Sequence, residues 1–343
     1  MRCDRRMLAV PVLVFLYLSI TSNLCGSDSP LLVYKKKYVM GTMFEVAAYD
    51  RDPEHASNAI EKAFQEIVRV DDLLSNYKSD SALSRLNCSA HLHAEQVPAG
   101  LYGVVEQAVE FSRLSNGKFD ISVAPLVDLW KAALFGSSSP SLEQQQKVRQ
   151  CVGYQKIELI PPDRIAFQSS CLRLDLGAIG KGFALDRAGE ILRSEGIQNA
   201  LINAGGSTLL ALGSPPGQSG WLVHLRDPSQ KVDPQVMLKD ESVSTSEQTP
   251  SSLLGVDSPG HIIDPDTGRP VQTEFAVSAV AKTGIASDAL STTLLLLGPE
   301  RGKALVHRIC SEQMRDAAAV WISRKAQIET TTTGPQILFG KRS

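Results

Sequence analysis

The chain has 343 residues, of which 43% are hydrophobic and 21% charged, with a formal net charge of −2 at pH 7. This composition is typical of a globular protein with a large core, and it excludes a disordered or fibrous chain. Because the near-neutral charge provides no basic stripe or domain, nucleic-acid binding is excluded as well.

The first 29 residues differ in kind from the rest. Three arginines precede an apolar run over residues 7–20, and a small, polar stretch follows, which is the layout of a secretory signal. The run of about 14 residues is shorter than the ~20 that span a bilayer, so we expect cleavage rather than a retained anchor. We therefore predict an export segment over residues 1–29 and one domain over 30–343.

The cysteines leave two questions open. Cys25 suggests lipidation and a membrane anchor, although Leu24 before it is not the small residue that a lipobox requires. The remaining cysteines of the exported chain, Cys88, Cys151, Cys171 and Cys310, would enter an oxidising compartment, where disulfide bonds form. Their wide spacing contains no zinc pattern, and both pairing and simple burial stay open.

Apolar periodicity predicts two long helices, over residues 53–74 and 98–114. The second half of the preceding segment, 34–49, alternates as a strand does. Shorter elements follow, namely a surface helix over 143–149 and strands over 157–160, 164–167 and 172–176.

A glycine-rich junction follows the strand over 172–176. It contains Gly177, Gly180 and Gly182, and apolar residues recur at helical spacing directly after it. Glycines before a helix let a backbone approach a ligand closely and direct free N–H groups at a phosphate. The alternative is a turn that merely needs positive φ. Both named glycine fingerprints fail, because Asp175 replaces a Walker A glycine and Leu185 replaces a small Rossmann residue.

The second half of the chain continues as short strands. A strand over 200–203 ends in the turn Gly205-Gly206, and His261 begins a strand that runs into the tight turn Asp264-Pro-Asp-Thr-Gly. Further strands are expected over 221–225, 241–244, 276–281 and 319–323, with a helix that starts near Ser287 and another over 303–310.

Asp288 and Thr292 are four residues apart and therefore share a helix face. A carboxylate and a hydroxyl are hard oxygen ligands of the kind that magnesium prefers. The alternative is ordinary capping, with Ser287 as the N-cap and Asp288 in the first turn. Other candidates, each with an ordinary structural explanation when taken alone, are His261, Tyr77, Phe119, Met40 and Lys181.

Six short motifs occur in one order along the chain. They are Met-Gly-Thr at 40–42, Gly-Lys-Phe-Asp at 117–120, Asp-Leu-Gly-Ala-Ile-Gly-Lys-Gly at 175–182, Asn-Ala-Gly-Gly at 203–206, His-Ile-Ile-Asp-Pro-Asp-Thr-Gly at 261–268 and Ser-Asp-Ala-Leu-Ser-Thr at 287–292. Together they closely resemble the ApbE family, the FAD:protein FMN transferases, from about residue 38 to residue 297.

The resemblance implies an α+β fold, a single compact domain with mixed β-sheets packed against helices. It also implies a magnesium-dependent enzyme of the periplasm that splits FAD and attaches FMN by a phosphoester bond to a serine or threonine of a target protein, with release of AMP. Such acceptor proteins are typically subunits of membrane flavoprotein redox complexes.

The family's site residues carry over onto matching positions of this sequence. The resemblance places Met40, Tyr77, Lys118, Phe119, Asp120, Lys181, Asp186 and His261 at the FAD site. It places the magnesium ion at the backbone oxygen of Ala178 and at the side chains of Asp288 and Thr292. His261 and Asp288 are both candidates for the group that deprotonates the acceptor hydroxyl.

Two positions depart from the family pattern. Ser207 replaces an Asn or Asp, and Glu247 replaces the glycine of a Thr-Ser-Gly motif. A carboxylate at position 247 would repel a diphosphate if it faced inward. Two alternatives to the transferase follow, a magnesium-dependent FAD pyrophosphatase that gives free FMN and AMP, and a non-catalytic exported flavin-binding protein.

Overall fold

A computed structural model describes residues 29–341, with gaps at 136–138, 249–259, 314–315 and 332. Residues 1–28 of the predicted export segment, Cys25 among them, lie outside the described residues. None of the helices in the described part is long and apolar enough to cross a membrane.

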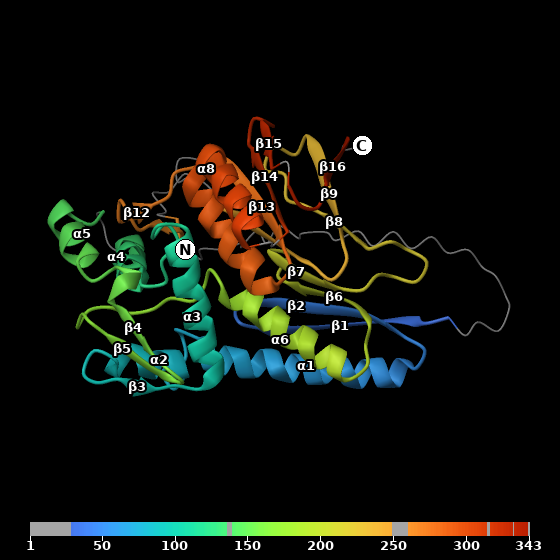
Figure 1. The fold of residues 1–343 in the computed structure, drawn as a ribbon, viewed down its shortest axis with the longest axis horizontal. Coiled ribbons are helices and arrows are strands. Elements are labelled where there is room, and N and C mark those ends of the chain that lie inside the picture. The colour runs from blue at the N-terminus through green and yellow to red at the C-terminus, as the bar shows by residue number, and fades with distance from the viewer. Residues whose placement is uncertain (1–28, 136–138, 249–259, 314–315, 332, 342–343) are drawn as a thin grey trace, which may run out of the picture.

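The centre of the fold is an antiparallel sheet of eight strands (Figure 1). Its spatial order is β1 (Leu31–Val39), β2 (Thr42–Asp50), β6 (Asn199–Ala204), β7 (Thr208–Leu212), β10 (Ser242–Glu247), β13 (Phe275–Ala281), β14 (Ala317–Ser323) and β15 (Ile328–Thr330). The pairs β1–β2, β6–β7 and β14–β15 are consecutive in sequence, whereas helices and loops separate β2 from β6 and β7 from β10. Their pairing in the sheet brings the motifs at the ends of these strands close together.

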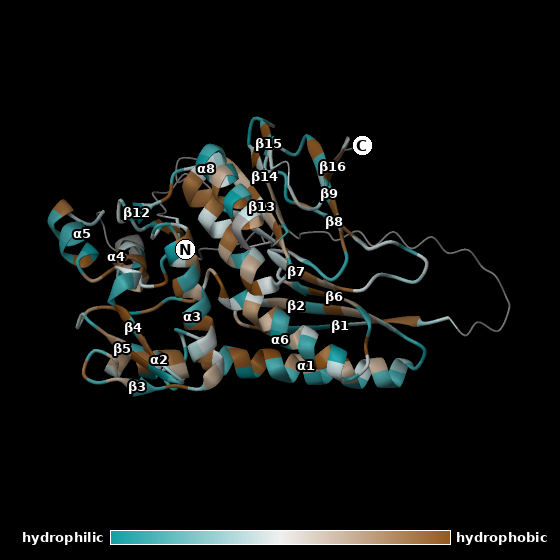
Figure 2. Cartoon of the chain, in the orientation of Figure 1, coloured by the Kyte–Doolittle hydropathy of each residue, from teal (hydrophilic) through white to brown (hydrophobic). Residues whose placement is uncertain are grey.

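Three long helices pack on one face of this sheet. They are α1 (Pro53–Leu74), α6 (Gly180–Ser194) and α8 (Gly284–Gln313), which kinks at Gly298 and Pro299. Figure 2 shows hydrophobic and hydrophilic residues alternating along α1, as expected of a helix that buries one side. The largest buried side chains of this layer include Trp321, Phe44 and Phe64.

The other face of the sheet is covered by three strands. β8 (Trp221–His224), β9 (Val232–Leu238) and β16 (Ile337–Lys341) form a second antiparallel sheet in the order β16-β9-β8. A separate apolar core between the two sheets includes Trp221, Val236 and Val243. This helix, sheet and sheet arrangement confirms the predicted α+β class.

The remaining elements form a smaller lobe beside the sheet. Its helices are α2 (Ala82–Ser89), α3 (Ala99–Leu114), α4 (Ala124–Phe135), α5 (Leu142–Arg149) and the 3₁₀ turn η1 (Tyr154–Lys156). Its strands are β3 (Glu95–Gln96), β4 (Ile157–Ile160), β5 (Arg164–Phe167), β11 (Ile263–Asp264) and β12 (Arg269–Pro270). A disulfide joins Cys151 to Cys171, while Cys88 and Cys310 are free.

The strand predicted over 172–176 is wrong, although its burial pattern is right. Leu172, Leu174 and Leu176 are buried, but the segment belongs to no sheet. The side chain of Asn87 pairs with both backbone groups of Leu174, its Oδ1 accepting at 2.7 Å and its Nδ2 donating at 3.0 Å. The segment also makes one isolated parallel bridge, between Arg173 and Val123, and the Asp175 N–H donates to the Ile121 carbonyl at 2.7 Å. A side chain and a few backbone contacts thus replace the full strand partner that alternation usually implies.

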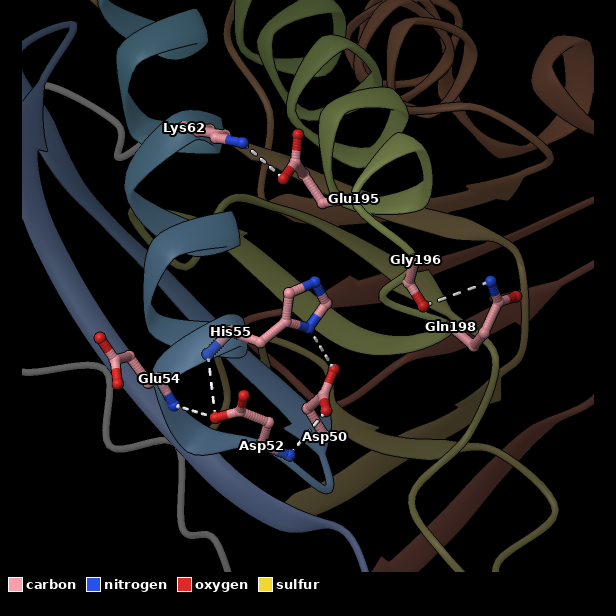
Figure 3. Close-up of polar contacts among 8 residues, drawn as sticks. All are labelled: Asp50, Asp52, Glu54, His55, Lys62, Glu195, Gly196 and Gln198. Atoms are coloured by element: carbon pink, nitrogen blue, oxygen red, sulfur yellow. Dashed lines mark hydrogen bonds and ion pairs between the residues drawn. The ribbon is translucent and has the colours of Figure 1, made fainter.

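The end of the fold where β2 meets α1 is held by charged side chains (Figure 3). Asp52 caps α1 by accepting the N–H groups of Glu54 and His55, and Lys62 of α1 pairs with Glu195 at the end of α6 at 2.6 Å. The His55 Nδ1 lies 2.8 Å from Asp50 Oδ2, and this hydrogen bond raises the pKa of His55.

The raised pKa of His55 predicts a pH-dependent contribution to stability. Because protonated His55 is favoured in the folded state, its contribution is complete below the unfolded pKa of about 6.5 and is lost as pH rises through the folded pKa. We expect His55→Gln to remove this loss. The check is denaturant unfolding of both proteins between about pH 5 and pH 9, and parallel pH profiles would contradict the prediction.

Candidate active site

A cavity of about 1630 Å³ lies at one end of the eight-stranded sheet. It is lined by the turn between β1 and β2, by the turn between β6 and β7, by the glycine junction before α6, by α8 and by the β11–β12 hairpin. Ten of the predicted site residues line it, namely Met40, Tyr77, Lys118, Phe119, Asp120, Ala178, Lys181, His261, Asp288 and Thr292. Asp186 is the predicted site residue that does not.

The Met-Gly-Thr and Asn-Ala-Gly-Gly motifs form two turns that touch. Met40 and Gly41 have φ of 51° and 73°, which makes a two-residue turn between β1 and β2. The Gly205 N–H donates to the Met43 carbonyl at 2.9 Å, and a Cβ on Gly205 would lie 2.1 Å from Thr42 Oγ1. Gly205 is therefore required by close packing as well as by its φ of 62°.

The glycine junction allows the helices α6 and α8 to approach each other closely. A Cβ on Gly182 in the first turn of α6 would lie 2.1 Å from the carbonyl oxygen of Gly284, the first residue of α8. The absence of side chains at both positions allows the starts of α6 and α8 to touch. This contact brings the glycine junction and the Ser-Asp-Ala-Leu-Ser-Thr motif to the same wall of the cavity.

The expected supply of free N–H groups at this junction needs correction. The Gly177 N–H donates to Asp175 Oδ1 at 2.7 Å, the Gly180 N–H to the Leu176 carbonyl at 2.7 Å and the Gly182 N–H to Asp288 Oδ2 at 2.9 Å. These groups are therefore occupied within the protein. The junction offers fewer donors to a phosphate than its sequence predicts.

The start of α8 is capped by Asp186 from α6. Its Oδ1 accepts the Gly284 N–H at 2.6 Å and its Oδ2 accepts the Ile285 N–H at 2.9 Å, while burial raises its pKa to about 6. The prediction that Ser287 caps this helix is wrong. The helix begins three residues earlier, and the Ser287 hydroxyl donates to the Gly284 carbonyl.

Asp288 is a buried carboxylate, with 4% of its surface exposed. Its partners among the described residues are neutral, being the Gly182 N–H, the Ser244 hydroxyl at 3.2 Å and the Thr208 hydroxyl at 3.3 Å. A buried charge without a cation is costly, so this arrangement favours a bound cation.

The donor set indicates which cation fits. Within the described residues, no three His, Cys, Asp or Glu side chains are grouped as metal ligands. One carboxylate, one hydroxyl and one carbonyl are too few for an all-protein calcium cage, and these three proposed donors are all oxygens rather than the nitrogen and sulfur ligands typical of zinc. They fit magnesium, which usually takes one or two carboxylates and completes its shell with water and substrate phosphate.

A row of hydroxyl contacts, here called the hydroxyl ladder, joins β10 to α8. Alternate serines of β10 face the helix, because every second residue of a strand lies on the same face. The pairs are Ser242 with Ser287 at 2.8 Å, Ser244 with Ser291 at 3.3 Å, and Ser246 with Ser291 at 2.8 Å and Thr292 at 3.1 Å. The ladder fixes Thr292 one turn beyond Asp288.

The Gly-Lys-Phe-Asp motif builds the opposite wall. The Lys118 ammonium is buried and donates to Asp264 at 2.7 Å and to Asp266 at 2.8 Å, which ties the hairpin after His261 to this motif. Asp120 accepts the N–H groups of Ser122 at 2.8 Å and Tyr154 at 2.9 Å, and its burial raises its pKa. Both charges are thus engaged within the protein.

His261 lies on the segment before β11 and keeps solvent-accessible surface inside the cavity. The surrounding walls remove water from the ring, which is the main cause of a lowered pKa, and the positive charges of Lys181 and Lys131 lower it further. Asp175 acts in the opposite direction. The lowered pKa favours the neutral form of His261, which can accept a proton.

A sequence model of the ApbE family matches residues 40–318, which is most of the chain. The chain belongs to the ApbE family. It is 31% identical over 282 residues to an FAD:protein FMN transferase of Escherichia coli, covering 78% of this chain and 79% of that protein. It is 30% identical to proteins of the same name from Salmonella typhimurium and Treponema pallidum, covering 82% of this chain and 83% of each.

Solved structures of the ApbE family share the fold. A flavinyl transferase ApbE of Pseudomonas stutzeri, in its apo form, superposes with a TM-score of 0.74 at 27% identity, over 91% of this chain and 96% of that one. A flavin transferase ApbE of Vibrio cholerae gives a TM-score of 0.74 at 25% identity, over 89% and 97%.

The departure from the ApbE pattern at Glu247 is balanced within the chain. Glu247 pairs with Arg324 at 3.0 Å and with Arg226, and 9% of its side chain is exposed. Two guanidinium groups thus neutralise the carboxylate that we expected to repel a diphosphate. The Ser207 hydroxyl donates to the Ala204 carbonyl at 3.1 Å, inside the turn that it closes.

Sequence reasoning missed several residues around Asp288. Thr208 and Ser244 supply its hydroxyl partners, and Gly284 allows α6 and α8 to touch. The alternation Ser242-Val243-Ser244-Thr245-Ser246 was the available signal for the hydroxyl ladder, since every second residue of a strand shares a face. No pattern in the sequence indicated that Lys131 would line the cavity.

Proposed function

We propose that this chain is an FAD:protein FMN transferase, which splits FAD and attaches FMN by a phosphoester bond to a serine or threonine of a target protein. The observation that carries the proposal is the buried Asp288, held by neutral donors beside Thr292 in a cavity large enough for a dinucleotide. The relatives that cover about four fifths of this chain have that name.

Magnesium would be held by Asp288, Thr292 and the backbone oxygen of Ala178, all of which line the cavity. When bound, it would neutralise the negative charge of the FAD diphosphate. Lys181, on the same wall, adds a further positive charge. This matches a reaction in which positioning and charge neutralisation contribute most of the catalysis.

His261 is the better of the two candidate bases. Asp288 is the proposed carboxylate ligand of the metal, whereas His261 lines the cavity and its lowered pKa favours the neutral form that accepts a proton. His261 would take the proton of the acceptor hydroxyl as its oxygen attacks the phosphorus attached to riboflavin. The bond from that phosphorus to the oxygen of AMP would break, and AMP would leave.

The roles of the remaining predicted residues belong to the same proposal. Met40, Tyr77 and Phe119 would contact the flavin nucleotide, while Lys118 and Asp120 would shape that wall. Asp186 would act on the site indirectly, since its carboxylate fixes the start of the helix that carries Asp288.

Location and acceptor are proposed from the sequence and the family resemblance. We infer that residues 1–29 direct export to the periplasm, with lipidation of Cys25 as the alternative that would attach the enzyme to a membrane. The acceptor would then be a subunit of a membrane flavoprotein redox complex that exposes a serine or threonine outside the cytoplasm.

One experiment separates this function from its two alternatives. The purified protein is incubated with FAD, magnesium and a candidate acceptor, and both AMP release and the mass of the acceptor are followed. AMP release together with a mass gain of one FMN supports transfer. AMP release without the mass gain supports a pyrophosphatase, and tight FAD binding with neither supports a flavin-binding protein.

A further inference from the structure

Lys131 of α4 lies at the cavity and contacts Tyr77. Its ammonium donates to the Tyr77 hydroxyl at 3.2 Å and lies 5.3 Å from the centroid of the Tyr77 ring. Both residues line the cavity together with His261 and Lys181. Lys131 is not one of the residues that the family motifs assign to the site.

Tyr77 needs an anchor if its ring is to hold one position. It stands in the loop between α1 and α2, and 87% of its surface is exposed. Among the described residues, Lys131 is the partner of the Tyr77 side chain, through both the hydroxyl and the ring. A cation over an aromatic face is attractive, and the hydrogen bond adds a direction.

Lys131 also contributes to the charge around His261. The charged groups that act on this imidazole come from three elements, Lys181 from α6, Lys131 from α4 and Asp175 from the glycine junction. Two fixed cations oppose protonation of the ring, and one carboxylate favours it. Removal of either cation therefore makes His261 easier to protonate.

We propose that Lys131 is a positioning residue for the transfer reaction, which holds Tyr77 at the cavity and keeps a fixed positive charge in the same cavity as His261. The proposal rests on the proposed function, in which Tyr77 contacts the flavin nucleotide and His261 accepts the proton of the acceptor hydroxyl. Lys131 thereby links the position of Tyr77 with the protonation state of the base.

The test compares three variants of the full chain. Lys131→Met removes the charge and the hydrogen bond, Lys131→Arg keeps a cation, and Tyr77→Phe removes the hydroxyl but no charge. NMR titration of the His261 ring, assigned with His261→Gln, reports its midpoint without any need for turnover. FAD affinity and the pH dependence of kcat/KM are measured beside it. Lys303→Met is the control for loss of a surface lysine that pairs elsewhere.

With Lys131→Met we expect the His261 midpoint to rise toward the ordinary value of about 6.5, and the acid limb of kcat/KM to move up with it. FAD should bind several-fold more weakly. Lys131→Arg should keep the low midpoint, and Tyr77→Phe should weaken FAD binding without moving the midpoint. Lys303→Met should behave as the unchanged protein does.

An unchanged midpoint and unchanged FAD affinity in Lys131→Met would overturn the proposal. So would a midpoint that rises equally in Lys131→Arg, since the charge would then not be the cause. Failure of the proposed function is a separate result, because it appears as absent transfer in the unchanged protein while the His261 titration still responds to Lys131.

Discussion

Asp288→Ala should lose AMP release from FAD by more than about 100-fold in kcat/KM, since ligand loss should exceed the 10–100-fold cost of losing an outer-shell partner. The substitution removes the only carboxylate among the proposed metal ligands. It also leaves the Gly182 N–H and the hydroxyls of Thr208 and Ser244 without their acceptor. The measurement is AMP release at a series of magnesium concentrations, with magnesium binding followed by calorimetry.

Asp288→Asn distinguishes the effect of losing the negative charge from the effect of losing the shape of the side chain. The amide oxygen can still accept the Gly182 N–H, so the wall should stay in place while the negative charge is gone. We expect Asp288→Asn to fold as the unchanged protein does and to bind magnesium weakly. Normal magnesium-dependent flavin transfer by either variant would refute the metal assignment.

Gly182→Ala should lower the free energy of unfolding by about 3 kcal/mol, the upper end of the cost of overpacking. Its Cβ would lie 2.1 Å from the Gly284 carbonyl oxygen, and backbone on both sides leaves no flexible atom to yield. The starts of α6 and α8 must separate, which moves Asp288 away from the glycine junction. We expect flavin transfer to fall with stability.

Gly103→Ala is the matched control for this substitution. Gly103 also lies inside a helix, α3, but a Cβ there meets nothing within 4 Å. Alanine should therefore stabilise the protein, by roughly 0.5–1 kcal/mol. Urea unfolding of the two variants provides the comparison, and equal midpoints for both would show that the helix crossing does not require glycine.

Local signals in the sequence were sufficient for α1 and α3. α1 was predicted to the residue, because Pro53 follows a capping aspartate and apolar residues recur on one side up to Leu74. β1 was not recognised as a separate strand. Its three consecutive lysines hide the alternation, and two of them contact α1, Lys35 through the Ser57 carbonyl and Lys37 through Glu61.

The wrong predictions of secondary structure arise where an element depends on residues that are distant in the sequence. The segment 172–176 alternates as a strand does, yet Asn87 pairs with both backbone groups of Leu174, and only an isolated bridge joins Arg173 to Val123. No periodicity shows that a side chain will take the place of a strand. The helix at Gly284 began earlier than expected because its cap, Asp186, belongs to another helix.

In the candidate site too, local features were predictable from the sequence and long-range contacts were not. The spacing of Asp288 and Thr292 predicted a shared face, and both line the cavity. Their surroundings could not be predicted from spacing alone, because they depend on the order of strands in the sheet. They consist of neutral donors from β7 and β10 and of the contact between Gly182 and Gly284.

The hydroxyl ladder has a thermodynamic consequence for ligand binding. Apolar side chains would let a helix slide along a strand at small cost, whereas paired hydroxyls are directional and make one register much better than its neighbours. α8 is thus ordered before any ion arrives. Because the ligands are already ordered, metal binding does not lose the conformational entropy of ordering them. The measured affinity for the ion should therefore be close to the affinity of a preformed site.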